Sequence, residues 1–314
     1  MSFRIRLIPF IIIVFSVLQS YGQQEAQVTQ NMFNYMSVNP GYAGMREGIC
    51  VTGIVRQQYV GLKNMEGTAV NPETFFLSAD APLDFLHGGL GITIHQDEIG
   101  FTSNTGIELD YSYHTRLGFG DLGIGVNIGF MNQVIDFGKL DPIDSSDPVL
   151  ENREGEEQDM MINASLGAFY EVEGNYYLGV ATSRIIQAQA PNTRFSPRRH
   201  YYAMGGYHYQ LTPDYKLTPS LMVTFDGTTT QFDLSSVVQY KDKYWGGLSY
   251  RAQDAVSIIA GLFWKDFKFG YSYDLNTSRL AGAGSDGAHE LMISYCFDLE
   301  LETDNNKYRN TRFL

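Results

Sequence analysis

The stretch from Ile107 to Phe130, IELDYSYHTRLGFGDLGIGVNIGF, contains the pattern that decides the fold. Apolar residues alternate with polar or very small residues in both halves, and a tight turn at Gly118–Asp121 separates the halves. A period of two residues predicts β-strands with two different faces. In a soluble sandwich the apolar face would turn inward. In a transmembrane barrel the apolar face turns to lipid and the polar face lines the lumen.

The same alternation continues from Gly48 almost to the end of the chain and predicts about fourteen strands. An even number of strands, many of them about ten residues long, is typical of bacterial outer-membrane barrels. We therefore predict an all-β fold, a transmembrane antiparallel β-barrel with a short N-terminal periplasmic or plug segment. The strands are expected near residues 48–59, 73–80, 88–97, 104–116, 121–133, 160–172, 175–186, 199–211, 215–226, 230–240, 243–251, 254–264, 266–275 and 288–298.

The connections between these strands alternate in length, which predicts their orientation. Barrels have short periplasmic turns and longer external loops. The short connections are Gly118–Asp121, Glu173–Asn175, Thr212–Asp214, Lys241–Lys243 and Lys265–Asp266. The longer ones, which we expect outside the cell, are Gly61–Asn71, Ile135–Asp159, Gln187–Pro197 and Thr277–Gly287. Two other connections on that side, Asp226–Thr229 and Ala252–Asp254, are short and weaken the alternation without reversing it.

The two ends of the chain complete the predicted organisation. Arg4 and Arg6 precede an apolar stretch from Leu7 to Leu18 and small residues before Gln23, which is the pattern of a secretory signal peptide. The predicted parts are a signal peptide at 1–22, a periplasmic or plug segment at 23–47, the barrel at 48–298 and a periplasmic tail at 299–314.

Charge and cysteine content restrict the partners and the covalent structure. The chain has 22 basic and 35 acidic residues, a net charge of −13, which argues against nucleic acid as a partner. Closure of the barrel requires residues 48–59 to pair with residues 288–297. Cys50 and Cys296 would meet only if these strands pair, and two buried free thiols are the preferred expectation.

A search for catalytic, cofactor-binding and metal-binding patterns predicts none. The six His residues lack metal-ligand spacing. His95 beside Asp97, and His289 beside Glu290, are interpreted as lumen or loop residues rather than acid/base pairs. An acidic loop lacks the spacing of a calcium-binding EF-hand and is interpreted as solvated, with bridging to lipopolysaccharide through divalent ions. Its acids are Asp141, Asp144, Asp147, Glu151, Glu154, Glu156 and Glu157.

Several motifs resemble those of PorP/SprF-like type IX secretion system membrane proteins. Asn31–Tyr35, Ser37–Gly44 and Arg56–Gly61 resemble the opening of that family, although Tyr59 stands where Trp is expected. Another departure is Ala288, in place of Ser before His-Glu. The further matches, which extend the resemblance over essentially the whole mature chain, are Asp80–Pro82, Gly89–Gly91, Gly246–Arg251, Gly270–Asp274 and Gly287–Glu290.

The resemblance implies an outer-membrane barrel of Bacteroidota that works with the type IX system. Its partners would be other secretion components, or secreted adhesins and other cargo. Motif residues are candidates for partner binding, although a structural role is the preferred interpretation: Asn39, Pro40, Tyr42, Arg56, Gln57, Tyr273, Asp274, His289 and Glu290. Tyr273–Asp274 should face His289–Glu290 across the last hairpin.

The predicted function is non-enzymatic export or surface attachment of partner proteins such as gliding-motility adhesins, by binding their C-terminal region. Partner choice should depend on loops, lumen or N-terminal segment, above all on the acidic loop. Two alternatives are a FadL-like transporter of small hydrophobic compounds and a barrel hydrolase. The transporter would need an apolar tunnel, whereas the inner face includes Glu108, Asp110 and His114.

Overall fold

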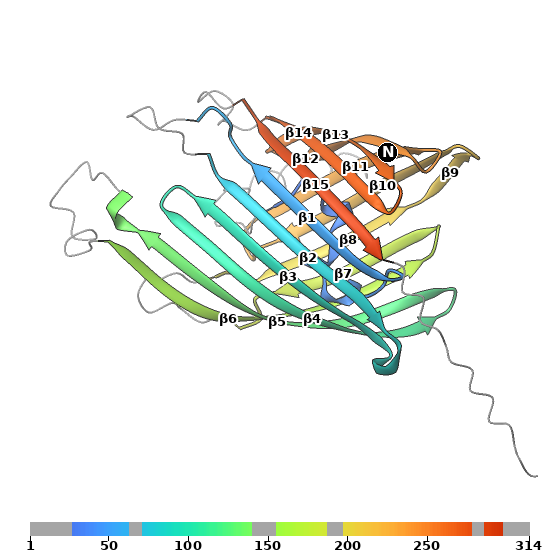
Figure 1. Ribbon diagram of the computed structural model, residues 1–314, viewed down its shortest axis with the longest axis horizontal. Helices are drawn as coiled ribbons and strands as arrows, with labels where there is room; N and C mark the ends of the chain where they lie inside the picture. Colours follow the sequence, from blue (N-terminus) through green and yellow to red (C-terminus); the bar gives the residue numbers. More distant parts are fainter. Residues whose placement is uncertain (1–26, 63–70, 140–154, 187–196, 278–285, 298–314) are drawn as a thin grey trace, which may run out of the picture.

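The computed structural model describes residues 27–62, 71–139, 155–186, 197–277 and 286–297. It is a closed antiparallel barrel of 14 strands, one of which is interrupted at His208 to give β8 and β9 (Figure 1). Both pieces pair with β10. The strands are β1 (Ile49–Gln57), β2 (Glu73–Leu83), β3 (Gly88–Ile99), β4 (Thr102–Leu117), β5 (Gly120–Asp136), β6 (Glu156–Val172), β7 (Tyr176–Ser183), β8 (His200–Tyr207), β9 (Tyr209–Thr212), β10 (Tyr215–Phe225), β11 (Thr230–Tyr240), β12 (Tyr244–Arg251), β13 (Ala255–Trp264), β14 (Phe267–Asn276) and β15 (Ala288–Phe297).

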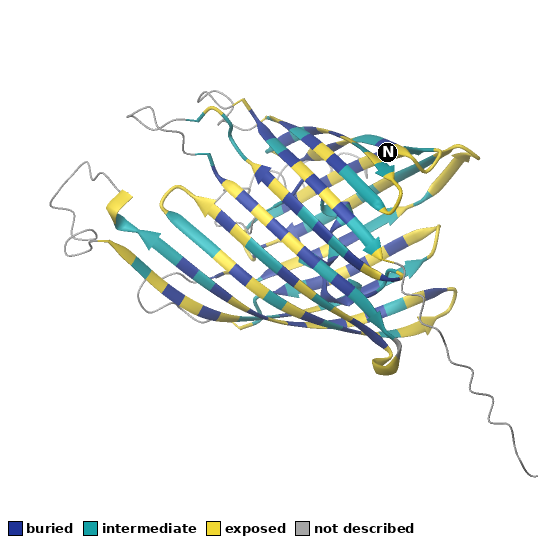
Figure 2. Ribbon diagram, viewed as in Figure 1, coloured by how far each residue is buried: buried dark blue, intermediate teal, exposed yellow. Residues whose placement is uncertain are grey.

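Side chains alternate between the two faces of the barrel wall as the sequence predicts. Figure 2 shows exposed and buried residues in turn along the strands. On β4, Leu109 is 56% exposed on the outer face, whereas the next residue, Asp110, and Ser112 two residues beyond it are buried on the inner face. The apolar face therefore turns outward, as in a barrel surrounded by lipid.

The first and last strands close the barrel, which confirms the predicted closure. β1 pairs with β15 from Ile49 opposite Phe297 to Gln57 opposite His289. With β8 and β9 counted as one strand, every strand in the described part of the chain therefore has two hydrogen-bonded neighbours, although the segment β9 itself pairs only with β10.

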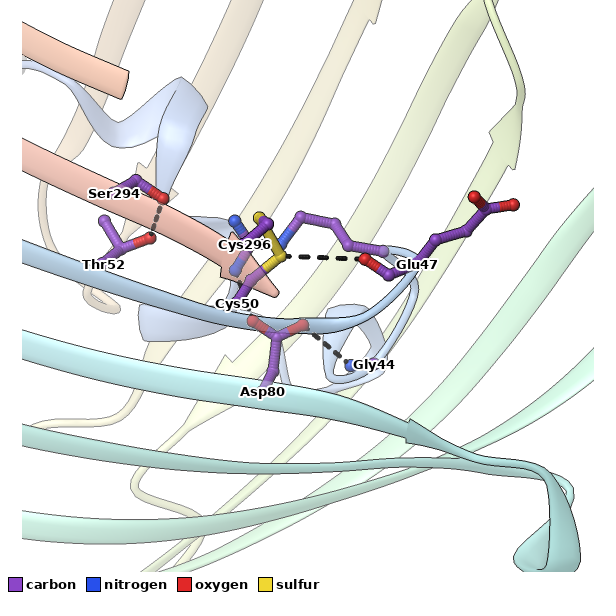
Figure 3. Close-up of a disulfide and its surroundings, with 8 residues drawn as sticks. Gly44, Glu47, Cys50, Thr52, Asp80, Ser294 and Cys296 are labelled. Atoms are coloured by element: carbon purple, nitrogen blue, oxygen red, sulfur yellow. Dashed lines mark hydrogen bonds and ion pairs between the residues drawn. A yellow bond between two sulfur atoms is a disulfide. The ribbon is translucent and has the colours of Figure 1, made fainter. Parts of the chain in front are cut away.

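The expectation of two free thiols is wrong, because Cys50 and Cys296 form a disulfide across this seam (Figure 3). The two residues are directly opposite in the β1–β15 register, with 4.0 Å between their Cα atoms. Their neighbours Thr52 and Ser294 form a hydrogen bond of 2.8 Å across the same seam. The sequence could not show this pairing, because it depends on the register of strands 246 residues apart.

We expect the disulfide to stabilise the closed barrel by about 2–5 kcal/mol, because it lowers the conformational entropy of the unfolded chain. Cys50→Ser with Cys296→Ser should lower the denaturant midpoint of unfolding without changing the folded far-UV spectrum. Maleimide should label neither cysteine in denatured, unreduced protein and both after reduction. Full labelling without reductant would contradict the disulfide.

Some strands are longer than predicted at the end that bears the longer connections. β5 ends at Asp136 and β6 begins at Glu156, so the connection between them is shorter than the predicted Ile135–Asp159. These 17-residue strands exceed the roughly ten residues that cross a membrane. Where a strand extends beyond the apolar layer of the membrane, its outward-facing residues need not be apolar. The alternation of apolar and polar residues that identifies a strand in the sequence is therefore lost there.

Residues 27–47, hereafter the plug, lie within the barrel (Figure 1). The plug forms three 3-10 helices, η1 (Asn31–Phe33), η2 (Tyr35–Ser37) and η3 (Pro40–Tyr42). Two more, η4 (Asp84–Leu86) and η5 (Phe137–Lys139), lie in connections. Across the described residues, no helix has the length and apolar character needed to cross a membrane.

Candidate functional site: the plugged lumen

The plug crosses the lumen from the β11–β15 wall to the β2–β7 wall. At its start, Gln27 exchanges hydrogen bonds with Gln231 of β11, at 3.1 and 2.7 Å. At its end, the Gly44 amide donates to Asp80 of β2 at 3.2 Å (Figure 3). Because Gln231 lies near the loop end of its strand and Asp80 near the opposite end of β2, the plug also descends along the barrel axis.

Glycines on the inner face of β3–β7 make room for the plug. A Cβ atom on Gly125 would lie 2.2 Å from the Pro40 carbonyl carbon, and one on Gly123 would lie 2.1 Å from the Gly41 oxygen. On β6, a Cβ atom on Gly167 would lie 2.1 Å from Asn39 Oδ1. These contacts are far shorter than van der Waals distances, so only glycine fits at these wall positions.

The turn at Asn39–Tyr42 is fixed by hydrogen bonds to itself and to the wall. Asn39 Oδ1 accepts from the Gly41 amide at 3.0 Å, which caps η3, and Pro40 occupies the first helical position. Asn39 Nδ2 donates to the Ala168 carbonyl of β6 at 3.0 Å. The turn is therefore held by its own side chain and locked into the barrel wall.

A buried ionic cluster anchors the other half of the plug. Arg56 Nη2 lies 2.7 Å from Asp274 Oδ2, and Arg56 Nη1 lies 3.3 Å from Glu290 Oε2. Thr29 completes this group, hereafter the Arg56 cluster: its hydroxyl accepts from Arg56 at 2.7 Å and donates to Asp274 at 2.8 Å. Its backbone amide donates to Glu290 at 2.7 Å, so the plug backbone is hydrogen-bonded directly to this cluster.

Two further arginines hold the plug, and sequence analysis missed both roles. Arg251 on β12 pairs with Asp233 at 2.7 Å and donates to the Val28 carbonyl of the plug at 3.3 Å. Arg46 at the end of the plug pairs with Asp80. A lone arginine or carboxylate at an inward position of a strand is the sequence signal that could have identified them, since such groups are buried only in pairs.

Aromatic side chains fill the space between plug and wall. Tyr35 and Tyr42 of the plug pack against Phe169 of β6, with ring centroids 5.4 and 4.9 Å apart. Phe33 lies 4.6 Å from Trp245, and the Lys268 ammonium lies 3.5 Å from the Phe33 ring. Burial raises the pKa of both Tyr35 and Tyr42 above its ordinary value, so both phenols remain neutral.

Above the plug, a cavity of about 640 Å³ extends toward the loop end of the barrel. Met36, Val38 and Pro40 of the plug form its floor, and it reaches Ile99 and Phe101 at the end of β3. Its walls include the polar side chains Asp97, Glu108, Asp110, Asn127, Gln133 and Asn163. Among the described residues, no three His, Cys, Asp or Glu side chains converge as in a metal site.

A family model described as type IX secretion system membrane protein PorP/SprF matches residues 20–295. The chain belongs to this family. With the barrel architecture, this places the protein in the outer membrane. A comparison with curated proteins gave no significant match.

Solved outer-membrane barrels share the fold with this PorP/SprF protein. The Ralstonia pickettii toluene transporter TbuX superposes with a TM-score of 0.50 at 13% identity, covering 83% of this chain and 92% of that chain. The TodX deltaS2S3 mutant, a monoaromatic hydrocarbon channel, gives a TM-score of 0.50 at 12% identity, covering 83% and 93%. At such low identity the likeness concerns the fold alone.

The PorP/SprF motif residues fall into two groups in the structure. Asn39, Pro40, Arg56, Asp274 and Glu290 are buried between plug and wall, and half-buried Tyr42 packs there too. In the second group Gln57 is exposed, while Tyr273 and His289 are half-buried at the loop end. The predicted pairing of the last hairpin is confirmed, since Tyr273 lies opposite His289.

Most of the predicted acidic loop lies outside the described residues, including Asp141, Asp144, Asp147, Glu151 and Glu154. Glu156 and Glu157 belong instead to the start of β6, where they lie opposite Asp136 and Ile135 of β5. The predicted signal peptide and the predicted periplasmic tail also lie outside the described residues.

Proposed function

We propose that this barrel is a non-enzymatic component of type IX secretion that exports partner proteins or attaches them to the cell surface. Secreted adhesins, recognised by their C-terminal region, are the proposed cargo, and other secretion components are further partners. The observation that carries the proposal is the family match over residues 20–295 together with a barrel whose lumen contains its own N-terminal segment. A barrel wall that is packed around a fixed plug supports a role in binding better than a role in catalysis.

The division of the chain into parts is also proposed. Residues 1–22 serve as a signal peptide, 23–47 as the plug segment, 48–298 as the barrel and 299–314 as a periplasmic tail. This assignment is supported by the plug, whose described part ends two residues before β1.

The proposed orientation puts the end that bears the longer connections outside the cell. β1, β5, β7 and β14 all end there, and short turns join the strands at the opposite end. Three connections at the loop end, β3–β4, β10–β11 and β12–β13, are short as well. An epitope inserted after Ser145 should be labelled on intact cells. Labelling only after rupture of the outer membrane would reverse the orientation.

The proposed partner-binding surface is the acidic outer loop, with lipopolysaccharide as a neighbour through divalent ions. Cargo co-purification should fall at least severalfold when all seven acids become Ser or Gln, because the loop loses its negative charge. The acids are Asp141, Asp144, Asp147, Glu151, Glu154, Glu156 and Glu157. A matched variant should neutralise acids of the opposite turns, Asp121, Glu173, Asp214, Asp242 and Asp266.

Undiminished cargo capture by the loop variant at low and physiological salt would remove the loop from the proposal. Equal loss in the matched variant would indicate a general charge effect instead. In either case the next surface to test is the group of motif residues at the loop end, exposed Gln57 and half-buried Tyr273 and His289.

A FadL-like transporter of small hydrophobic compounds is the second candidate. The cavity of about 640 Å³ is within the roughly 300–1,000 Å³ of small-molecule sites and favours this candidate. Its carboxylate and amide walls favour a polar ligand instead. Toluene uptake into liposomes containing the protein should equal that of empty liposomes, and faster uptake would support transport.

A further inference from the structure

The inner face of β4–β6 carries a polar cluster just above the plug. In the register of these strands, Glu108 pairs with Gly129, which in turn pairs with Asn163. Two residues along each strand on the same inner face, Asp110 pairs with Asn127, which in turn pairs with Ser165. Two carboxylates and two amides therefore occupy adjacent positions on three neighbouring strands. We call Glu108, Asp110, Asn127 and Asn163 the acceptor cluster.

The amide groups of the acceptor cluster direct their N–H bonds to its carboxylates. Asn127 Nδ2 donates to Asp110 Oδ1 at 2.8 Å and to Glu108 Oε2 at 3.3 Å. Asn163 Nδ2 donates to Glu108 Oε1 at 3.5 Å. Three buried oxygens then have no hydrogen-bond donor among the described residues: Asp110 Oδ2, Asn127 Oδ1 and Asn163 Oδ1. Asp110 and Asn127 are each only 3% exposed.

Asp110 differs from the lumen carboxylates that hold the plug. Asp80, Asp233 and Asp274 each pair with an arginine. Among the described residues, no ion pair includes Asp110, whose carboxylate accepts a hydrogen bond from the neutral amide of Asn127. A buried carboxylate without a cation is costly, so Asp110 lacks a neutralising charge within the described part of the chain.

The acceptor cluster is accessible from the loop end, because all four side chains line the cavity above the plug. We propose that Asp110, Asn127 and Asn163 bind the ammonium or guanidinium group of a ligand that enters this cavity from outside the cell. The carboxylate supplies the charge, and the two amide oxygens accept further N–H bonds.

An organic cation fits these oxygens better than a metal ion. Hard divalent ions require several converging carboxylate or carbonyl oxygens, and no three acids or other strong ligands converge in the described residues. An ammonium has three N–H donors and a guanidinium has five, pointing in different directions. Such a group can reach separated acceptors on neighbouring strands.

The cation can come from a lysine or arginine of a partner polypeptide, or from a free polyamine. The polypeptide source deepens the proposed function and rests on it, because cargo would approach the barrel from the same end. The chemistry of the site is the same in both cases, so binding of small probes tests it without any cargo.

The test is titration calorimetry of the full-length protein in detergent micelles. The probes are capped Gly-Gly-Arg-Gly-Gly and Gly-Gly-Lys-Gly-Gly peptides, a norleucine peptide, spermidine, and magnesium and calcium chloride. We expect the Arg or Lys peptide to bind and the norleucine peptide to give no heat. Asp110→Asn should weaken binding at least tenfold, whereas Glu173→Gln in the β6–β7 turn should not change it.

Asn163→Ala provides a second variant at a half-buried position, with an expected severalfold loss, should Asp110→Asn fail to fold. Binding of spermidine but of neither peptide would support the ammonium site and contradict a partner polypeptide as the source of the cation. Equal binding in the Asp110 variant, or binding of divalent ions alone, overturns the proposal. Cargo capture by Asp110→Asn is measured separately, so loss of the site and loss of the export function are distinguished.

Discussion

Replacing Arg56 by Gln should destabilise the folded protein by about 3–5 kcal/mol and release the first half of the plug. The reason is that Asp274 and Glu290 would keep their charges in a buried site without their cation. Both carboxylates are only 1% exposed, and Arg56 is 2% exposed, so water cannot replace the lost contact. The measurement is denaturant unfolding in lipid vesicles, together with limited proteolysis of residues 27–47.

The neighbouring position supplies the control for this variant. Gln57 follows Arg56 on β1, points to the opposite side and is exposed, with a hydrogen bond of 2.7 Å to exposed Glu73. Gln57→Ala should change stability by less than about 0.5 kcal/mol. Adding Asp274→Asn and Glu290→Gln to Arg56→Gln should restore part of the loss, because the unpaired charges disappear. Equal stability of the wild type and Arg56→Gln would show that the cluster does not hold the plug.

The barrel was predictable from sequence because the two faces of each strand contact different environments. Leu109 meets lipid while Asp110 meets the lumen, so local sequence alone reveals the alternation. The break at His208 and the extensions of β5 and β6 were not predictable, since they depend on neighbouring strands and on where the apolar slab ends. The disulfide was missed for the same reason, because a one-residue change of register would separate Cys50 from Cys296.

The candidate site was predictable only in part. The motifs include Asn39, Arg56 and Glu290, but the sequence did not show that all three hold the plug. Their contacts join residues far apart in the chain, as with Thr29 and Glu290, 261 residues apart. The concentration of glycines on one inner wall was visible in sequence, and in retrospect it indicates a segment packed against that wall.

That glycine wall leads to the other large expected effect, which is opening of the lumen. In Gly125→Val, the new side chain must occupy the space of the Pro40 carbonyl and the Gly41 nitrogen, which lie 2.2–2.4 Å from the Cβ position. Backbone on both sides cannot move by that amount without losing the Asn39 hydrogen bonds to β6 and β7. We therefore expect the second half of the plug to leave the wall.

The result to measure is ion conductance in planar bilayers. Gly125→Val should conduct at least severalfold more than wild type, and residues 36–47 should become cleavable by protease. The matched control is Val126→Leu, which adds volume at the next residue of β5 on the lipid face, where Val126 is 45% exposed. That variant should conduct like wild type. A Gly125→Val barrel that conducts like wild type and resists the protease would mean that the barrel wall, rather than the plug, moves to accommodate the valine. These glycines would then not fix the position of the plug, which forms the floor of the cavity beside the acceptor cluster on the same strands.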